Sequence, residues 1–257
     1  MAQARESTPE ICLELRNVGH QFGSLKVIEG ISLRVPKGER RAIIGPNGAG
    51  KTTLFNIIAG EIRPTAGTVL FEGRDVTQLP TYRHAEMGIS RTFQTTSLFP
   101  KLTVLENVGL ALQAFQPGSM QMLRPRSMYR HWDREAEELL AQSGLSHRAH
   151  EPLAGLSYGE QRQVEILLAL AQKPRLLLLD EPTAGLSRGD LRQVQAPLKA
   201  LSREVTIVLI EHDMDVVFDL VDRIAVLHNG GIVAEGTVDE IRKNEVVQEI
   251  YLGGTHR

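Results

Sequence analysis

Short apolar runs bounded by glycines recur in the N-terminal part of this 257-residue chain. Such runs, rich in β-branched side chains, are typical of strands. We expect strands at ICLELRNV (11–18), KVIEGISLRV (26–35), RRAIIG (40–45) and GTVLFEG (67–73). KTTLFNIIAG (51–60) has a helical pattern instead, and it ends on Gly60 as a C-terminal cap.

The middle of the chain, about 95–170, changes to helical periodicity. Apolar residues recur at helical spacing in VLENVGLALQAF (104–115) and DREAEELLAQSG (133–144). Between them lies QPGSMQMLRPRSMYR (116–130), which has prolines, methionines and arginines but no period. We interpret this stretch as a loop or an irregular insertion.

Strands and helices alternate again after residue 172. The pattern predicts a strand at RLLLLD (175–180), a helix at 190–201, a strand at VTIVLI (205–210) and a helix at 213–221. A hairpin that turns on Asn229-Gly230 follows, and then a short helix opened by the capping box Thr237 to Glu240. This alternation indicates an α/β fold with a largely parallel sheet, into which the helical middle is inserted as a lobe.

Composition narrows the class of protein. The net charge of −2 gives no overall attraction to nucleic acid or anionic lipid. A single cysteine, Cys12, excludes an internal disulfide framework and fits a reducing compartment. The first residues contain no apolar segment typical of a signal peptide, and the longest apolar stretches are strand-sized. We therefore expect a soluble, cytoplasmic protein whose membrane role, if any, depends on a partner.

GPNGAGKT (45–52) matches the phosphate-loop pattern G-x-x-x-x-G-K-[ST] in full. Its glycines let backbone N–H groups face phosphate oxygens, and the following helix adds its positive end. Lys51 is placed to reach the β- and γ-phosphates, and the Thr52 hydroxyl to bind Mg²⁺. A glycine-rich turn with a chance lysine is the alternative, but the predicted strand before the loop and the helix after it favour the phosphate loop.

The apolar strand that ends in LLLLDE (176–181) supplies the acidic partner of such a loop. Asp180 is placed to hold the metal through water, and Glu181 suits a general base on the attacking water. A buried strand that ends in an acid is common by itself, so the assignment depends on its combination with the phosphate loop. Together the two motifs indicate a P-loop NTPase, and the absence of an N-K-x-D motif argues against a GTPase.

LSYGEQ (156–161) combines a helix start with an unusual glycine. Ser157 and Glu160 have the spacing of a capping box. Gly159 lies in the first turn, where glycine costs about 1 kcal/mol relative to alanine, and the sequence suggests no packing role for it. Bare backbone at a helix N-terminus suits an anion.

LSYGEQ resembles the LSGGQ signature of ATP-binding cassette (ABC) ATPases and precedes the acidic strand as it does in that family. RTFQ (91–94) looks like the Q-loop, whose Gln94 would sense Mg²⁺ and the γ-phosphate. IEHD (210–213) looks like the switch loop with His212, and Phe22 takes the place of the aromatic residue that stacks on adenine. Alone, Phe22 could be ordinary core and His212 an ordinary strand-end histidine; the order and spacing of the motifs carry the resemblance.

The resemblance spans about 11–253 and implies a P-loop NTPase (RecA-like) core with an N-terminal antiparallel β subdomain and an inserted α-helical lobe. It implies one ABC ATPase domain over 11–254, with its core at about 11–94 and 172–254, the lobe at about 95–171, and flexible termini at 1–10 and 255–257. The implied catalytic residues are Glu181, His212, Gln94 and Lys51, and the implied metal ligands are Thr52, Gln94 and Asp180. The implied ATP-binding residues are Phe22, Gly45, Pro46, Asn47, Gly48, Ala49, Gly50, Lys51, Thr52, Thr53, Ser157, Gly159 and Glu160.

In this family two cassettes pair head to tail, so that each signature binds the γ-phosphate held by the opposite phosphate loop. RTFQ, SLFPKLTVLENV (97–108), LSYGEQR, IEHDMDVV and YLGG (251–254) look most like the ATPases of branched-chain amino acid importers. This resemblance implies two permease subunits, an indirect partnership with a periplasmic solute-binding protein, a peripheral location on the cytoplasmic face of the inner membrane, and no nucleic-acid partner. It also places the apolar, slightly basic segment 97–108 near the groove for a permease coupling helix. The alternative is that this segment is an ordinary loop and helix packed in the lobe. An exporter ATPase of lipopolysaccharide type and a non-transport cassette are the alternatives.

Three positions depart from the family pattern. Tyr158 replaces the first glycine of LSGGQ, and Glu160 replaces its glutamine. We expect Tyr158 to point away from the phosphate, so that binding survives. Ser187 stands where the D-loop usually ends in Asp; it keeps a hydroxyl and loses the charge, which predicts a weaker contact across the dimer.

Overall fold

A computed structural model describes residues 9–92, 98–114 and 130–252 of the chain. These residues form two compact units. The first unit contains the chain up to Thr81, the segment Ser202–Ile207 and the chain from Val221 onward. The second contains Tyr82–Leu201 and Val208–Leu220. None of the helices in these described ranges combines the length and the apolar character that a membrane-spanning segment needs.

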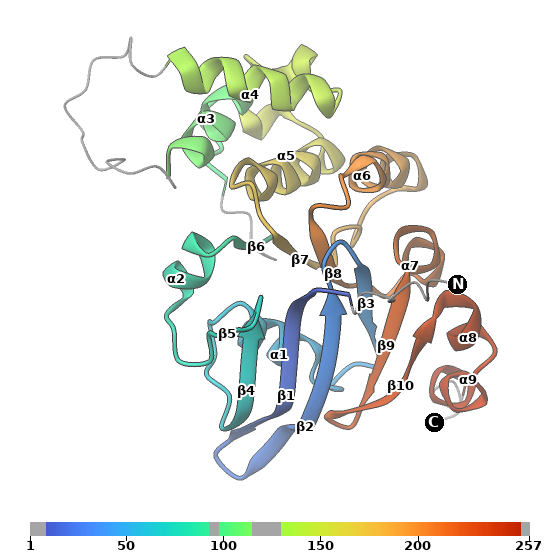
Figure 1. The fold of residues 1–257 in the computed structure, drawn as a ribbon. Helices are drawn as coiled ribbons and strands as arrows, with labels where there is room; N and C mark the ends of the chain where they lie inside the picture. The colour runs from blue at the N-terminus through green and yellow to red at the C-terminus, as the bar shows by residue number, and fades with distance from the viewer. Residues whose placement is uncertain (1–8, 93–97, 115–129, 253–257) are drawn as a thin grey trace, which may run out of the picture. The chain divides into compact units, whose positions relative to one another are not determined.

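An antiparallel sheet makes up one part of the first unit (Figure 1). Its strand order is β2 (Leu25–Pro36), β1 (Ile11–Phe22), β4 (Ala66–Phe71) and β5 (Arg74–Asp75). In the register of this sheet, Leu15 of β1 lies opposite Leu33 of β2 and Val69 of β4. All three side chains are buried, as expected for residues that share one face of a pleated sheet.

The other part of the first unit contains three further strands. Among them, β9 (Arg223–His228) pairs in parallel with β3 (Arg40–Ile44) and antiparallel with β10 (Gly231–Thr237). Every residue of β3 is buried. The helices of this unit are α1 (Lys51–Ile58), α8 (Val238–Arg242) and α9 (Glu245–Leu252).

The predicted hairpin is present between β9 and β10. Asn229 and Gly230, its two turn residues, both have positive φ, 47° and 80°. Such a pair is typical of the type I′ turn that matches the twist of a two-stranded ribbon.

In the second unit, β7 (Leu176–Asp180) pairs in parallel with β6 (Ile89–Arg91), and all five residues of β7 are buried. The strand β8 (Thr206–Ile210) crosses between the two units along the chain. The carbonyl oxygen of Ile210, the last residue of β8, accepts a hydrogen bond from the N–H of Glu181, which directly follows β7. The helices α2 (Thr81–Glu86), α6 (Arg188–Ala200) and α7 (Met214–Leu220) complete this part.

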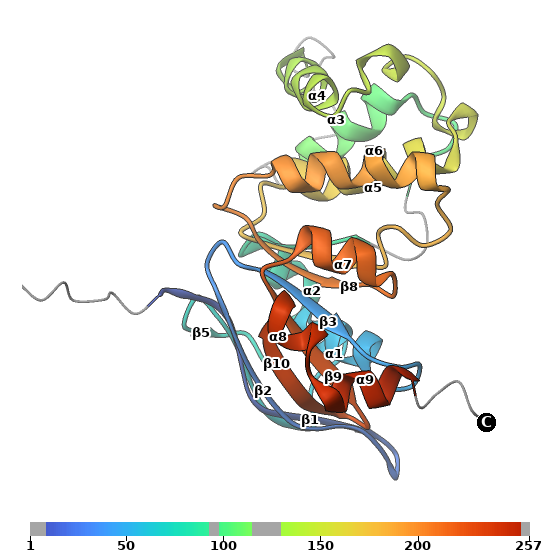
Figure 2. The same ribbon diagram turned by 90° about the vertical axis from the view of Figure 1, so that its right-hand side faces the viewer.

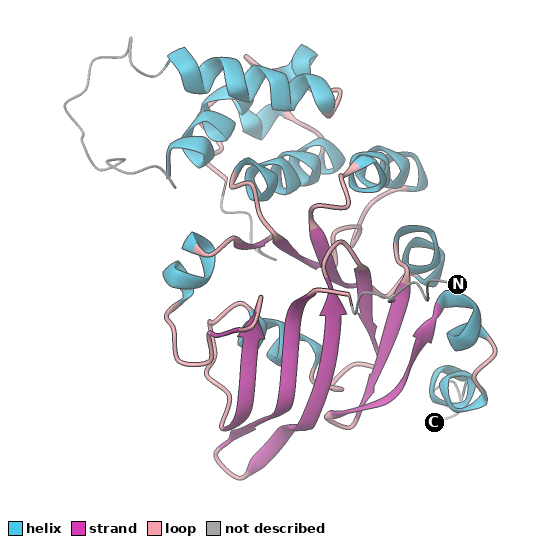
Figure 3. Cartoon of the chain, viewed as in Figure 1, coloured by secondary structure: helices cyan, strands magenta, loops and turns pink. Residues whose placement is uncertain are grey.

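Three further helices of the second unit form a lobe with its own core (Figures 2 and 3). They are α3 (Val104–Ala114), α4 (Arg130–Gln142) and α5 (Tyr158–Ala171). Short 3-10 turns at Ser146–Arg148 and Leu153–Gly155 connect α4 to α5. The buried core residues of the lobe are Val104, Val108, Leu112, Ala136, Leu140, Leu145, Ala149, Leu153, Leu156, Val164, Leu167 and Ala171.

The element boundaries differ from the predicted ones in a few places. The helix predicted from residue 133 begins at Arg130, and most of the predicted loop 116–130 lies outside the described residues. The helix after the phosphate loop ends at Ile58, and Gly60 takes a left-handed φ of 76° two residues later. The short elements β5, α2, β6 and α9 were not predicted from the pattern. The two to six residues of β5, α2 and β6 carry too little periodicity to be recognised.

Candidate functional site

The phosphate-loop segment lies between β3 and α1 in the first unit. A methyl group in place of the Gly45 hydrogen would lie 2.1 Å from the carbonyl oxygen of Leu227, so glycine is required by close backbone approach. At the other end of the loop, Gly50 has a φ of 102°, and no side chain in the described part of the chain caps α1 after it. First-turn N–H groups without a side-chain acceptor are suited to a phosphate.

Lys51 folds back along the same loop. Its Nζ donates hydrogen bonds to the carbonyl oxygens of Gly45, at 2.7 Å, and Pro46, at 3.0 Å. The side chain is buried, whereas the next residue, Thr52, is exposed. The loop therefore carries a fixed ammonium group and an accessible hydroxyl, as a site for phosphate and Mg²⁺ requires.

The β9–β10 turn supports the phosphate loop from outside. The N–H of Gly230 donates to the carbonyl oxygen of Ala49 at 3.2 Å, and the carbonyl oxygen of Gly230 accepts from the Glu29 N–H at 2.8 Å. A methyl group on Gly230 would lie 2.7 Å from the carbonyl oxygen of Val27. One on Gly50 would lie 2.9 Å from the same atom. Loop, hairpin turn and β2 therefore meet with no space for a side chain.

Phe22 ends β1 with 51% of its surface exposed. Its ring makes an edge-on contact with His20, with 4.5 Å between centroids. The alternative interpretation as an ordinary core residue is wrong, because a core phenylalanine would be buried. An exposed ring in the same unit as the phosphate loop remains available to stack on a base.

Asp180 ends β7 in the second unit and is 1% exposed. Its Oδ2 accepts a hydrogen bond from the Arg91 guanidinium at 2.8 Å. Its Oδ1 is buried and has no hydrogen-bond partner among the described residues. A buried carboxylate oxygen without a donor fits water-mediated contact with Mg²⁺.

Glu181 and His212 meet in the same unit. The His212 Nε2 lies 2.7 Å from the Glu181 Oε1, and both side chains are partly exposed. Glu181 has a φ of 47°, which is unusual for a residue with a side chain, and its N–H donates to the carbonyl oxygen of Ile210. Left-handed backbone at a candidate catalytic residue is the kind of strain that functional sites retain.

Arg162 ties the helix that follows the signature to this acidic turn. Its guanidinium is buried and donates to the carbonyl oxygens of Asp180, Glu181 and Pro182 at 3.0, 2.7 and 3.1 Å. It also pairs with Glu165 at 2.6 Å. Burial raises the pKa of Glu165, and the arginine opposes that rise.

The predicted capping box at the signature is present. The Ser157 Oγ accepts from the Glu160 N–H, and the Glu160 carboxylate accepts from the Ser157 N–H at 2.8 Å. Arg148 also donates to Glu160, at 2.9 Å. Burial acts to raise the pKa of Glu160, but the hydrogen bonds from Ser157 and Arg148 outweigh it and lower the pKa below its ordinary value.

Gly159 does have a packing role, contrary to the sequence-based expectation. A methyl group there would lie 2.9 Å from the Cβ and 3.0 Å from the Cγ of Asp190 in α6. The missing side chain thus lets α5 approach α6. Sequence could not show this, because the neighbour is 31 positions away. The phosphate role predicted for Gly159 stays a prediction.

The departures from the family pattern have structural roles of their own. The Tyr158 hydroxyl donates to the carbonyl oxygen of Ala184 at 3.3 Å, so its ring extends toward AGLS (184–187), the segment that resembles the D-loop. Ser187 caps α6: its Oγ accepts from the Asp190 N–H and donates to the Asp190 Oδ2 at 2.6 Å. Its hydroxyl is therefore engaged within the chain.

The structure thus groups the predicted site residues in two sets. Phe22 and the loop Gly45–Thr53 belong to the first unit. Asp180, Glu181 and His212, together with the signature, belong to the second. Gln94 lies outside the described residues. Sequence reasoning assigned no role to Arg91, Arg162 and Glu211, although they lie inside the recognised segments RTFQ, LSYGEQR and IEHD. Their place in those segments is the only signal that could have indicated them.

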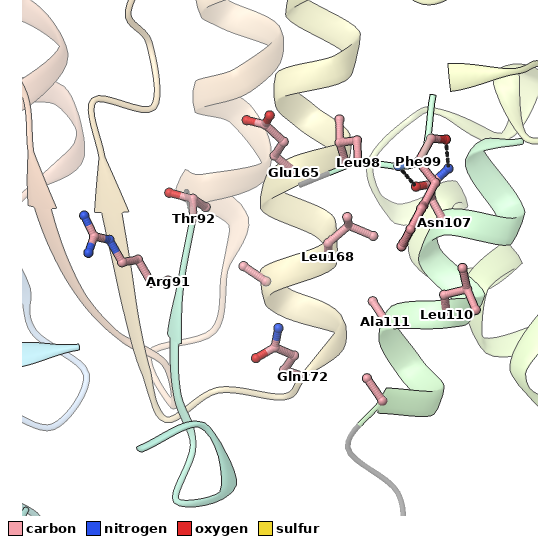
Figure 4. A pocket seen from close by; sticks show the side chains of 12 residues that line it. Arg91, Thr92, Leu98, Phe99, Asn107, Leu110, Ala111, Glu165, Leu168 and Gln172 are labelled. Carbon is pink, nitrogen blue, oxygen red and sulfur yellow. Dashed lines mark hydrogen bonds between the residues drawn. The ribbon is translucent and has the colours of Figure 1, made fainter. Parts of the chain in front are cut away.

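A pocket of about 240 Å³ opens in the second unit (Figure 4). Its apolar wall includes Leu98, Phe99 and Leu110, and the last two are substantially exposed. Asn107 fixes the segment at its rim: it accepts from the Phe99 N–H at 2.9 Å and donates to the Phe99 carbonyl oxygen at 3.1 Å (Figure 4). The remaining lining residues are Arg91, Thr92, Ala111, Ala114, Glu165, Leu168, Ala169 and Gln172.

Comparison with known proteins gives a consistent result. Residues 28–184 match the family model described as ABC transporter, and residues 232–257 match the model for the branched-chain amino acid ATP-binding cassette transporter. The chain is 37% identical over 248 residues to the high-affinity branched-chain amino acid transport ATP-binding protein BraF of Pseudomonas aeruginosa, covering 94% of this chain and 97% of that protein.

Two solved structures show the same fold. A nucleotide-free ATP-binding cassette from an ABC transporter superposes with a TM-score of 0.82 at 32% identity, covering 94% of this chain and 98% of that one. A dimeric post-hydrolysis cassette bound to ADP and Pi superposes with a TM-score of 0.75 at 30% identity, covering 88% and 98%. The predicted fold class, a P-loop NTPase core with an antiparallel β subdomain and a helical lobe, is confirmed.

Proposed function

Because the chain belongs to the ABC transporter family and is an ATPase of that family, we propose that it powers uptake of branched-chain amino acids or related small solutes. The observation that carries this proposal is the match along nearly the whole chain to a branched-chain amino acid transport protein, with a C-terminal segment of the same type. Such an ATPase would work peripherally, at the cytoplasmic face of the membrane that holds its permease subunits.

ATP is bound, in this proposal, by the two sets of residues described above. The phosphates lie against the amides of Gly45–Thr53 and the Lys51 ammonium, and adenine stacks on the exposed ring of Phe22. Thr52, Asp180 and Gln94 would hold Mg²⁺, which would neutralise charge on the phosphate oxygens. Within the described residues, α1 begins without a side-chain cap and the Asp180 Oδ1 has no hydrogen-bond partner, and both observations support these assignments.

Glu181 takes the proton of the attacking water, and His212 fixes the Glu181 carboxylate. A general base must lie within hydrogen-bond reach of its water and hold a defined orientation. The 2.7 Å contact between the two side chains supplies that orientation, while the partial exposure of Glu181 leaves it accessible to water.

Turnover requires a second cassette, identical or paralogous. Ser157 and Gly159 of one protomer contact the γ-phosphate held by the loop Gly45–Thr53 of its partner, at the positive end of α5. The related cassette that was solved as a dimer with ADP and Pi supports the pairing of two cassettes. Two bound ATP molecules then stabilise the dimer, and hydrolysis releases it.

The apolar pocket of the second unit receives a short helix of a permease subunit. Exposed Phe99 and Leu110 offer an apolar surface on a segment that Asn107 holds in place. An amphipathic helix that packs into such a groove is a common mode of recognition. Arg91 and Thr92, which line the pocket, also contact Asp180, so the pocket and the acidic strand share residues.

The test is to isolate the complete membrane complex that contains this chain and to measure its ATPase activity. We expect two hydrophobic permease subunits to copurify, and we expect leucine, isoleucine or valine, presented with the solute-binding protein, to raise ATP hydrolysis. Stimulation by unrelated solutes alone would overturn the solute class. Copurification with nucleic acid and without permeases would overturn the transport function.

A further inference from the structure

Glu211 stands between β8 and His212, and its carboxylate is buried: the residue is 3% exposed. No role in binding or hydrolysis follows for it from the motifs. A buried carboxylate is costly unless hydrogen bonds compensate for the water that it has lost. Its partners therefore indicate what it does.

The two carboxylate oxygens of Glu211 serve different segments. Oε1 accepts from the N–H of Thr183, at 2.9 Å, and from the Thr183 hydroxyl. Oε2 accepts from the backbone N–H of His212 at 2.9 Å. All three donors are uncharged, so the carboxylate is stabilised by charge-assisted hydrogen bonds to neutral groups.

The hydrogen bonds of Glu211 connect the segments that carry Glu181 and His212. Thr183 follows Glu181 by two residues, and His212 touches Glu181 through its side chain. The Glu181 N–H donates to Ile210, which immediately precedes Glu211. Glu211 thus fixes the backbone next to both members of the pair at once, and all five residues of this network belong to the second unit.

We propose that Glu211 is a positioning residue, which holds the His212 backbone against the turn after Glu181 so that the imidazole meets the catalytic carboxylate. This inference rests on the roles proposed above for Glu181 and His212. Because Glu211 is buried and both of its carboxylate oxygens accept from Thr183 and His212, its loss should slow turnover without weakening ATP binding.

Glu211→Gln tests the proposal with little change in volume. The amide oxygen can still accept from Thr183, but the amide NH₂ then faces the His212 N–H, and two donors cannot bond. Thr183→Val removes the hydroxyl donor alone and keeps the shape of the side chain. Thr206→Val is the matched control: Thr206 is also buried, lies at the far end of β8, and accepts from the Gly38 N–H at 3.0 Å.

We expect Glu211→Gln in the full chain to lower kcat by about tenfold, the effect of one lost hydrogen bond to a charged group, while the KM for ATP stays within about twofold. Thr183→Val should give a smaller loss of kcat, and Thr206→Val none. The decisive readout is the combination with His212→Ala. Each double variant should be no slower than His212→Ala alone, since Glu211 and Thr183 act through the histidine.

Losses that add to that of His212→Ala, or a rise in KM equal to the fall in kcat, would overturn the inference. If Glu211→Gln does not fold, as circular dichroism would show, Thr183→Val gives the same test. If His212→Ala and Glu181→Gln both keep the wild-type kcat, the proposed roles of that pair fail instead.

Discussion

The Nε2 of His212 lies 2.7 Å from the Oε1 of Glu181. Glu181→Gln keeps the shape of this contact but removes the base, because an amide does not accept the proton of water. We predict that the variant binds ATP with wild-type affinity, loses hydrolysis by at least about a hundredfold, and accumulates an ATP-stabilised dimer. Phosphate release and size-exclusion chromatography with and without ATP measure these effects.

The matched control is Glu204→Gln, which makes the same change at an exposed position. It should hydrolyse ATP at the wild-type rate. Normal turnover in Glu181→Gln would remove the general-base assignment.

The signature serine can be tested without losing its helix cap. Asp and Asn cap helices about as well as Ser, so Ser157→Asp and Ser157→Asn should both keep the fold of α5. Only Asp places a negative charge where the partner's γ-phosphate is expected. We predict that Ser157→Asp loses ATP-driven dimerisation and turnover while monomer affinity for ATP is unchanged, and that Ser157→Asn retains most of both.

Monomer affinity is measured by titration with a fluorescent ATP analogue at protein concentrations too low for dimerisation. Should Ser157→Asp weaken that affinity as much as it weakens turnover, the signature would act on nucleotide in its own chain. The opposed-dimer arrangement would then be wrong.

Features that depend on residues close together in the sequence could be predicted, and features that depend on residues far apart in the sequence could not. The phosphate loop, the Ser157 capping box and the Asn229-Gly230 turn are local, and each was predicted correctly as a structural element. The Arg91–Asp180 ion pair joins residues 89 positions apart, so it depends on the register of β6 against β7. No local pattern encodes that register.

The absence of information on distant contacts also explains why the sequence suggested no packing role for Gly159. Its first-turn position suggested bare backbone for an anion, but the side chain that excludes a Cβ is Asp190 of another helix. Helix-to-helix approach depends on the packing of the whole unit, and a single sequence contains no direct record of it.

The β9–β10 turn gives a prediction about the phosphate loop. Gly230→Ala introduces a Cβ at a φ of 80° and 2.7 Å from the Val27 carbonyl oxygen, so the turn must shift. Its hydrogen bond to Ala49 would shift with it. We expect a loss of about 1–3 kcal/mol in the free energy of unfolding, as is typical of strained backbone, together with weaker ATP binding.

Gly231→Ala is the control for this change, since among the described residues only the His228 carbonyl oxygen, 4.0 Å away, would lie near its Cβ. It should leave both ATP affinity and stability close to wild type. Urea unfolding and nucleotide titration measure the two effects. If Gly230→Ala lowered stability but left ATP affinity unchanged, the turn would support the sheet without positioning the loop.

The lowered pKa of Glu160 predicts a pH-dependent contribution to stability. The hydrogen bonds from Ser157 and Arg148 favour the charged form of the Glu160 carboxyl against the opposing effect of burial. The folded chain therefore binds fewer protons at this carboxyl than the unfolded chain does. The stabilisation is therefore present above the ordinary value of 4.5 and is lost as pH falls through the lower pKa of the folded state. Glu160→Gln can keep the capping box but removes the charge opposite Arg148.

We expect Glu160→Gln to unfold at lower urea concentration than wild type at pH 7.5, by about 1 kcal/mol, as for a hydrogen bond between charged groups in a partly exposed site. The difference should shrink as the pH is lowered below about 4.5, because wild-type Glu160 then loses its charge as well. Arg148→Gln should reproduce the effect, and the double variant should add little to either. A stability difference that is equal at pH 7.5 and pH 4 would show that the substitution acts through packing, and that the charge of Glu160 does not stabilise the signature helix.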